Sequence, residues 1–135
     1  MPDVMAKNLL DTNLLLRFLT DDDPKKAVAV EHLLKTSKQP LIVTDMAFAE
    51  LAWVMASFYG FEKSTIIAKL ASILDIEIIK TNKKLLRQSL VVYAKHNIDF
   101  IDAYHAAFMK LKSVDFIYSY DRDFDKVNSI KRLEP

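Results

Sequence analysis

The chain has 135 residues, a formal net charge of +1 and a hydrophobic share of 51%. This length suits one ordinary domain, so we expect a single domain over residues 1–135. The hydrophobic share excludes a disordered chain, and the small net charge gives no global argument for binding nucleic acid or a membrane surface. The absence of cysteine excludes disulfides and thiolate metal sites.

Glycine is scarce, because Gly60 is the only one in the chain. Loops that cradle phosphates need several glycines, which excludes a P-loop and a glycine-rich dinucleotide site. The sequence also lacks the Gly-x-Ser-x-Gly motif of serine hydrolases and the His-Glu-x-x-His motif of zinc proteases.

The apolar stretches are far shorter than the roughly 20 residues that span a bilayer. Residues 1–7 lack the charged and apolar regions of a signal peptide. We therefore expect a cytoplasmic protein that does not enter a membrane.

The first half of the chain shows clear start and stop signals for secondary structure. Asp11, Thr12 and Asn13 are candidate caps for a short helix, and Pro24 marks the start of a second helix. The expected elements are a strand over about 6–10, helices over 14–19 and 24–37, a strand over 41–43, and a helix from 45 to about 59 that Gly60 ends.

The second half continues the alternation of helices and strands. The expected elements are a helix over 62–73, a strand over 76–79 that contains Glu77, helices over 82–96 and 100–111, a strand over 116–120, a short helix over 121–127 and an edge strand over 130–133. Strands separated by helices predict an α/β fold with a parallel sheet covered on both faces.

Four acids interrupt apolar stretches: Asp11, Glu50, Asp102 and Asp121. Burying an isolated carboxylate is very costly, so each acid needs a partner. Asp11, Glu50 and Asp102 have no basic residue beside them in the sequence, whereas Arg122 follows Asp121. We therefore expect the partner to be a metal cation.

The predicted elements place these acids near the carboxyl ends of strands. Asp11 follows the first strand and Asp121 the fourth, while Asp102 opens the helix that leads into the fourth strand. Sites in open α/β sheets form at this edge. Oxygen ligands select Mg²⁺ or Mn²⁺, which activate water and stabilise charge on a phosphoryl oxygen. The pattern thus predicts metal-dependent hydrolysis of phosphodiester bonds.

Structural explanations compete with this hypothesis. Helix capping could explain Asp11, Asp99 and Asp121. Glu50 caps nothing, because it lies in the middle of a helix, but it could face solvent or pair with Arg17. His105 reads as a packed helix residue. The cations Arg17, Lys83, Lys84, Arg87 and Arg122 read as surface residues that could hold phosphates if they flank the acids.

Four sequence motifs resemble those of PIN-domain nucleases of the VapC toxin type. They are Leu9-Leu10-Asp11-Thr12-Asn13, Ala49-Glu50-Leu51, the stretch from Asp99 through Asp102 to Ala107, and Ser119-Tyr120-Asp121-Arg122-Asp123-Phe124. All four occur in order over almost the whole chain, which is more specific than any one of them. Ser119 stands where threonine is commoner, and Tyr104-His105 where small or aliphatic residues are more usual.

The resemblance implies a three-layer α/β/α PIN-like fold around a short central parallel sheet. It also implies a Mg²⁺- or Mn²⁺-dependent endoribonuclease that acts on RNA as the toxin of a toxin–antitoxin pair. Such toxins usually form homodimers and are inhibited by a small antitoxin protein that covers the acidic site.

By the same resemblance, the catalytic and metal-binding acids are Asp11, Glu50, Asp102 and Asp121, with Asp123 as an additional or substitute ligand. Thr12, Asn13 and the Ser119 hydroxyl would support the site, and Asp99 matches a less constant acid. The alternative is a non-catalytic PIN-like module that binds RNA or protein. A receiver-like signalling domain fits less well, because Glu77 lies inside the predicted third strand rather than at its end.

Overall fold

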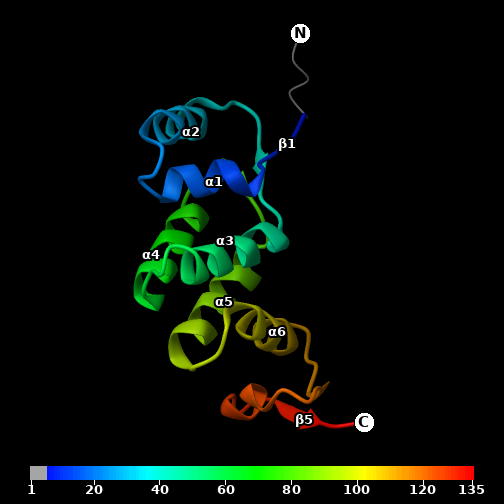
Figure 1. Cartoon of the computed structure of the whole chain (residues 1–135). Coiled ribbons are helices and arrows are strands. Elements are labelled where there is room, and N and C mark those ends of the chain that lie inside the picture. The colour runs from blue at the N-terminus through cyan, green and yellow to red at the C-terminus, as the bar shows by residue number, and fades with distance from the viewer. Residues whose placement is uncertain (1–5) are drawn as a thin grey trace. The chain divides into compact units, whose positions relative to one another are not determined.

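The computed structural model describes residues 6–135 and shows helices alternating with short strands (Figure 1). The expectation about a signal peptide rests largely on residues 1–5, which lie outside the described part. From residue 6 onward, no helix is both long and apolar enough to cross a membrane.

The chain divides into two compact units, Met1–Asn82 and Lys83–Pro135. The organisation as one domain over 135 residues stays a prediction.

A three-stranded parallel sheet organises the first unit. Its strands are β1 (Asn8–Leu9), β2 (Leu41–Ile42) and β3 (Ile79–Lys80), paired in the order β1-β2-β3. Leu41 lies opposite Asn8 on one side and opposite Ile79 on the other. This parallel pairing of strands that are separated by helices confirms the predicted α/β class.

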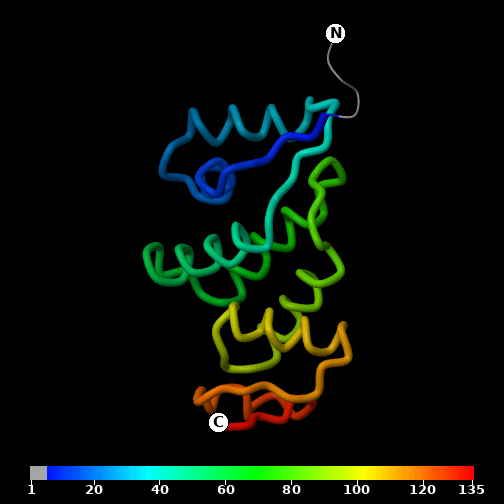
Figure 2. Tube along the Cα trace, turned by 90° about the vertical axis from the view of Figure 1, so that its right-hand side faces the viewer, coloured from blue at the N-terminus to red at the C-terminus, as the bar shows by residue number. Residues whose placement is uncertain are grey.

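Four helices complete the first unit: α1 (Thr12–Leu19), α2 (Pro24–Thr36), α3 (Asp45–Ser57) and α4 (Lys63–Leu74). α1 contacts α2 and α3, and Figure 2 shows α3 and α4 side by side. The core between them contains fully buried Leu15, Phe48, Met55 and Leu70. Burial of each such side chain stabilises the fold by about 1.5–3 kcal/mol.

Both ends of α3 follow the signals in the sequence. The Thr44 hydroxyl accepts a hydrogen bond from Ala47 N at 3.1 Å and so caps the first turn. Gly60 ends the segment with φ +65°, and the following amide, Phe61 N, donates to Met55 O at 3.0 Å. A left-handed residue after the last turn lets the chain satisfy these carbonyls, which is why glycine suits this position.

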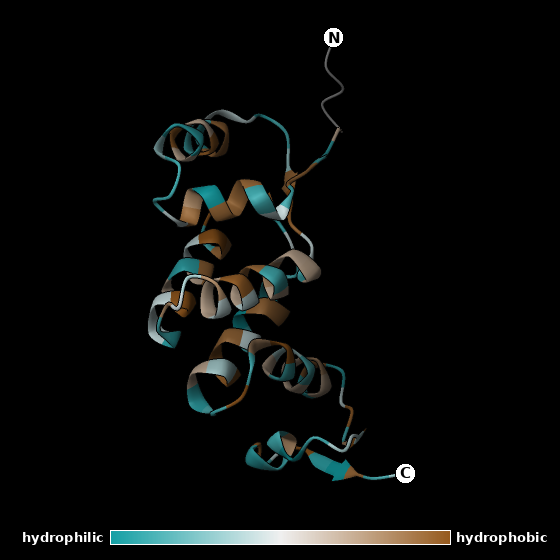
Figure 3. Ribbon diagram, in the orientation of Figure 1, coloured by the Kyte–Doolittle hydropathy of each residue, from teal (hydrophilic) through white to brown (hydrophobic). Residues whose placement is uncertain are grey.

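The second unit contains α5 (Lys83–Lys95), α6 (Phe100–Leu111), β4 (Phe116–Tyr118), the 3₁₀ helix η1 (Arg122–Lys126) and β5 (Lys131–Leu133). α5 packs on α6, with the rings of Tyr93 and Phe100 edge to face at 5.7 Å. β4 and β5 pair in parallel, and η1 lies in the connection between them and contacts both α6 and β5. Figure 3 shows that hydrophilic residues dominate η1 and β5.

Two details of the predicted elements are wrong. The first helix begins at Thr12 rather than at Leu14, so Thr12 and Asn13 lie inside it. The third strand begins at Ile79, which leaves Glu77 in the preceding turn and not inside a strand. Each error comes from an apolar run that starts or stops a few residues away from the backbone hydrogen bonds that define the element.

Candidate metal centre

The first motif places Asp11 directly after β1, at the N-cap position of α1. Its backbone is extended, with φ −74° and ψ 146°, and its side chain makes no capping hydrogen bond. The Asp11 side chain is exposed. Capping therefore does not explain why an acid stands here, and the carboxylate is available to a ligand.

Glu50 lies in the second turn of α3 and contacts the first motif through one hydrogen bond. The Thr12 hydroxyl donates to Glu50 Oε2 at 3.4 Å. Glu50 does not pair with Arg17, because Arg17 binds Asp22 at 3.1 Å. The first unit thus joins a residue of the first motif to the acid of the second motif.

The burial predicted for Asp11 and Glu50 is wrong, since both side chains are exposed, and Asp121 of the fourth motif is exposed as well. α3 buries a different face, formed by Phe48, Leu51 and Met55, and Glu50 points away from that face. The cost of an isolated buried ion therefore does not apply to these two acids. Their case rests on position and on the contact with Thr12.

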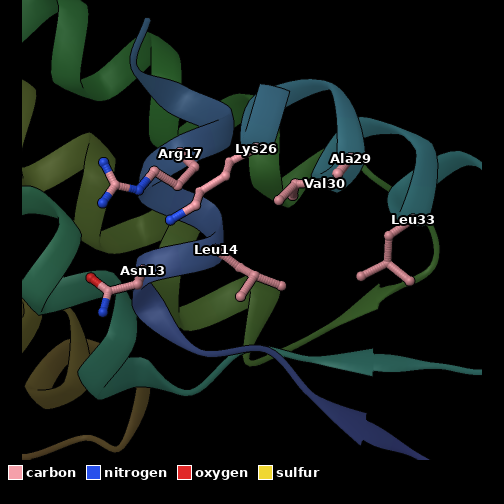
Figure 4. Close-up of a pocket in the computed structure, with 7 residues that line it drawn as sticks. All are labelled: Asn13, Leu14, Arg17, Lys26, Ala29, Val30 and Leu33. Atoms are coloured by element: carbon pink, nitrogen blue, oxygen red, sulfur yellow. The ribbon is translucent and has the colours of Figure 1, made fainter. Parts of the chain in front are cut away.

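Asn13 lines a groove of about 430 Å³ between α1 and α2 (Figure 4). Leu14 points to the side on which α2 carries Val30 and Leu33, whereas the Asn13 amide extends away from them. The residues that line this groove are Asn13, Leu14, Arg17, Lys26, Ala29, Val30 and Leu33. Neither Asp11 nor Glu50 is among them, so the groove is distinct from the acidic positions.

A further acid sits beside the carboxyl end of β2. Asp45, the first residue of α3, accepts hydrogen bonds from Asn82 Nδ2 at 3.2 and 3.1 Å. Both residues line a hollow of about 540 Å³ at the carboxyl ends of β2 and β3. The Asn82 amide thus holds the Asp45 carboxylate in place.

In the second unit, Asp102, Asp121 and Asp123 form a cluster. One carboxylate oxygen from each lies within 4.8 Å of the other two. Asp102 comes from the first turn of α6, whereas Asp121 is the N-cap residue of η1 and Asp123 lies in its first turn. Sequence positions about twenty residues apart thus supply one group of acids.

The turn that carries Asp121 is held by a chain of short local hydrogen bonds. Asp121 N donates to Ser119 Oγ at 2.9 Å, and Asp123 N donates to Asp121 Oδ1 at 2.9 Å. Asp121 therefore caps η1, as the structural alternative expected, while its other oxygen is left for a ligand. The Ser119 hydroxyl accepts this hydrogen bond, as a threonine hydroxyl at the same position could.

Crowding affects the protonation of Asp102. Its pKa is raised, first by burial and then by the negative charges of Asp121, Asp99 and Asp123, with His105 lowering it slightly. Like charges held together favour the protonated form unless a cation neutralises them. Asp102 therefore keeps its proton to higher pH than an isolated aspartate does.

Lys126 places a positive charge beside one acid of the cluster, Asp123. Its ammonium lies 2.9 Å from Asp123 Oδ1 and also donates to Asn97 O at 2.9 Å. In the part of the chain that the structure describes, no such ion pair reaches Asp102 or Asp121. The carboxylates of Asp102 and Asp121 therefore keep their full negative charge for a metal ion when they are ionised, whereas Lys126 partly neutralises the charge of Asp123.

The donors fit Mg²⁺ or Mn²⁺. All three side chains of the cluster offer carboxylate oxygens, which hard divalent cations prefer. Mg²⁺ usually keeps several waters and takes only one or two carboxylates from a protein, so the cluster offers enough protein ligands.

Other expected residues do not join the cluster. Asp99 occupies the N-cap of α6 without a capping hydrogen bond and acts on Asp102 only through its charge. His105 is exposed, with its ring 6.4 Å from that of Phe124. Sequence reasoning missed Lys126 and Arg132, which contact this region. The spacing of three residues from Asp123 to Lys126 was a usable signal, whereas Arg132 left none.

Comparisons with known proteins give one family match and one similar structure. The family model of the PIN domain matches residues 9–130. No curated protein sequence matches the chain. Among solved structures, the chain is similar to VapC20 of Mycobacterium tuberculosis, described as a Sarcin-Ricin loop cleaving toxin. The identity is 17% over 96% of this chain and 100% of that one, with a TM-score of 0.43.

Proposed function

The chain belongs to the PIN domain family, and from this premise we propose that it is a divalent-metal-dependent endoribonuclease that hydrolyses RNA phosphodiester bonds. The observation that carries the proposal is the cluster of Asp102, Asp121 and Asp123, whose oxygens approach within 4.8 Å. Crowded acids of this kind are unfavourable by themselves and become favourable around a cation.

The proposed ligands of the metal are Asp102 and Asp121, with Asp123 as an additional one. Asp11 and Glu50, in the first unit, are proposed as further catalytic and metal-binding acids on the strength of their motifs. Mg²⁺ or Mn²⁺, when bound, supplies an activated water and stabilises negative charge at phosphorus.

The residues of the chain have separate tasks in this proposal. Asp102 must lose its proton before it binds the cation, and its raised pKa makes this step dependent on pH. Thr12 orients Glu50 by its hydrogen bond, and Ser119 holds the amide of Asp121. No residue serves as a covalent nucleophile in this scheme, because water attacks the phosphorus.

The order of the four motifs supports a narrower proposal. We infer that the chain is a VapC-type toxin whose activity a small antitoxin protein inhibits, and that it forms a homodimer. Co-expression with a small protein from an adjacent reading frame, followed by co-purification and loss of nuclease activity, tests the partner. Gel filtration with light scattering tests the dimer.

One observation favours the second candidate function, a non-catalytic module that binds RNA or protein. Lys126 already neutralises Asp123, and this contact weakens the demand for a metal. The two candidates differ in turnover. Binding of RNA without cleavage at saturating Mn²⁺ would select the module.

The experiment that tests the nuclease compares cleavage of a mixed-sequence RNA by the wild type with and without chelator. Asp121→Asn is the test variant, and Asp115→Asn is the matched control, because Asp115 is an exposed acid of the same unit outside the cluster. We expect cleavage to require metal, to be lost in Asp121→Asn and to be retained in Asp115→Asn. Equal cleavage by the two variants would reject the proposed site.

A further inference from the structure

Arg132 on β5 is a nearly buried cation next to the turn of the proposed metal ligands. Its side chain is only 12% exposed, and a charge in such a place requires partners. Its guanidinium reaches Asp125 twice, from Nε to Oδ1 at 3.0 Å and from Nη2 to Oδ2 at 3.3 Å. This is the two-pronged geometry that a guanidinium forms with a carboxylate.

The third nitrogen of Arg132 binds elsewhere. Nη1 donates to the backbone carbonyl of Ser119 at 3.0 Å and to Glu134 Oε1 at 2.7 Å. Ser119 and Asp125 bracket the segment that carries Asp121 and Asp123. One planar group therefore ties both ends of that segment to β5.

The contacts continue inward from Ser119 to the acids. Ser119 N donates to Leu133 O at 2.9 Å, which fixes the same residue to the strand that carries Arg132. Ser119 Oγ then accepts from Asp121 N, and Asp121 Oδ1 accepts from Asp123 N, both at 2.9 Å. The orientation of the Asp121 carboxylate thus depends on a backbone position that Arg132 holds.

We propose that Arg132 is a positioning residue of the metal centre, which fixes the turn 119–125 so that Asp121 and Asp123 face Asp102. This inference rests on the proposed function, because it assigns a role toward the metal that those acids would hold. Arg132 itself does not touch the cation, and it acts through Ser119 and Asp125. Supporting residues of this kind typically change metal affinity 10–100-fold when they are lost.

Charge and position predict opposite outcomes for Arg132→Met. Removing a positive charge near an acidic cluster should by itself strengthen the binding of a cation. Loss of positioning should weaken it. The matched control is Arg122→Met, because Arg122 lies on η1 in the same turn, is exposed and makes none of the contacts described for Arg132.

The test measures the dissociation constant of Mn²⁺ by electron paramagnetic resonance on the full chain without RNA, at a temperature where circular dichroism shows each variant folded. We expect Arg132→Met to weaken Mn²⁺ binding at least about tenfold. Arg132→Lys should also weaken it, because an ammonium cannot reproduce the fork. Arg122→Met should leave it unchanged or slightly tighter. If Arg132→Met does not fold, Asp125→Asn tests the same contact from its other side, and it should also weaken Mn²⁺ binding.

The outcomes separate this inference from the proposed function. If the wild type binds Mn²⁺, Asp121→Asn does not, and Arg132→Lys and Asp125→Asn match Arg122→Met, then the metal site stands and the positioning role of Arg132 is wrong. If the wild type and Asp121→Asn bind Mn²⁺ equally weakly, the proposed function fails and the positioning role fails with it.

Discussion

The hydroxyl of Thr12 donates to Glu50 Oε2 at 3.4 Å, joining two motifs that are 38 residues apart in the sequence. Thr12 is the first residue of α1, and Glu50 lies on the exposed face of α3. The contact between these two helices brings the hydroxyl to the carboxylate. Glu50 therefore has a polar neighbour but no cation of its own in the described ion pairs.

Loss of this hydrogen bond should lower RNA cleavage modestly. A net hydrogen bond is worth about 0.5–1.5 kcal/mol, so we expect Thr12→Val to reduce kcat/KM by roughly 2- to 10-fold. Thr12→Ser keeps the hydroxyl and should stay close to the wild type. Steady-state cleavage assays at saturating Mn²⁺ measure both, and equal losses in the two variants would assign the effect to packing instead of hydrogen bonding.

Removing one acid should stabilise the metal-free protein and destabilise the metal-bound one. Asp102→Asn relieves repulsion from Asp121 and Asp123, and we expect it to raise the free energy of unfolding in chelator by about 0.5 kcal/mol. The wild type should gain about 2.7 kcal/mol when Mn²⁺ is present at 100 times its dissociation constant, and the variant much less. Thermal melts with and without Mn²⁺ measure both effects. A variant that gains as much as the wild type from Mn²⁺ would contradict the ligand role of Asp102.

The raised pKa of Asp102 predicts a pH dependence of stability without metal. In the folded state the carboxyl holds its proton to higher pH than in the unfolded state, where its pKa is the ordinary value near 3.8. The folded state therefore binds more protons between those two pKa values, and stability falls as pH rises through this window. Thermal melts in chelator from pH 3 upward measure the stability of the wild type and of Asp102→Asn. The stability of the wild type should fall more steeply with pH in this window than that of Asp102→Asn. Equal slopes of stability against pH would contradict the raised pKa.

The sequence predicted the frame of the fold because its signals are local. Pro24 and Gly60 mark helix ends through a fixed φ and a left-handed backbone, and both act where expected. The α/β class followed from the alternation of apolar runs. Exposure was harder to predict, because which face of α3 is buried depends on its contacts with α1 and α4, and Glu50 proved exposed.

In the candidate site, too, local motifs could be predicted from the sequence, whereas contacts that depend on the folded structure could not. Asp102, Asp121 and Asp123 were identified from motif spacing, and the structure brings their oxygens together. Arg132 could not be identified, because its partners Ser119 and Asp125 become its neighbours only when β5 pairs with β4. Contacts that form only when two strands pair leave no periodic pattern in the sequence.

Replacing Gly60 by alanine should destabilise the protein only through the positive φ of this residue. A Cβ added there would meet no atom within 4 Å, so Gly60→Ala introduces no clash. Its φ of +65° is nevertheless unfavourable for an L side chain, and we expect a loss of about 1 kcal/mol in the free energy of unfolding. Urea denaturation measures this loss. No change, or a gain in stability, would mean that the backbone at this position relaxes.

In the proposed function, the acids hold a divalent cation that RNA cleavage requires. The most direct test is cleavage of a defined RNA at saturating Mn²⁺ by the wild type, Asp102→Asn and the exposed-acid control Asp115→Asn, each repeated with excess chelator. We expect endonucleolytic cleavage by the wild type and Asp115→Asn, none by Asp102→Asn, and none in chelator. Cleavage that survives chelation, or that Asp102→Asn performs at the wild-type rate, would contradict the proposed function.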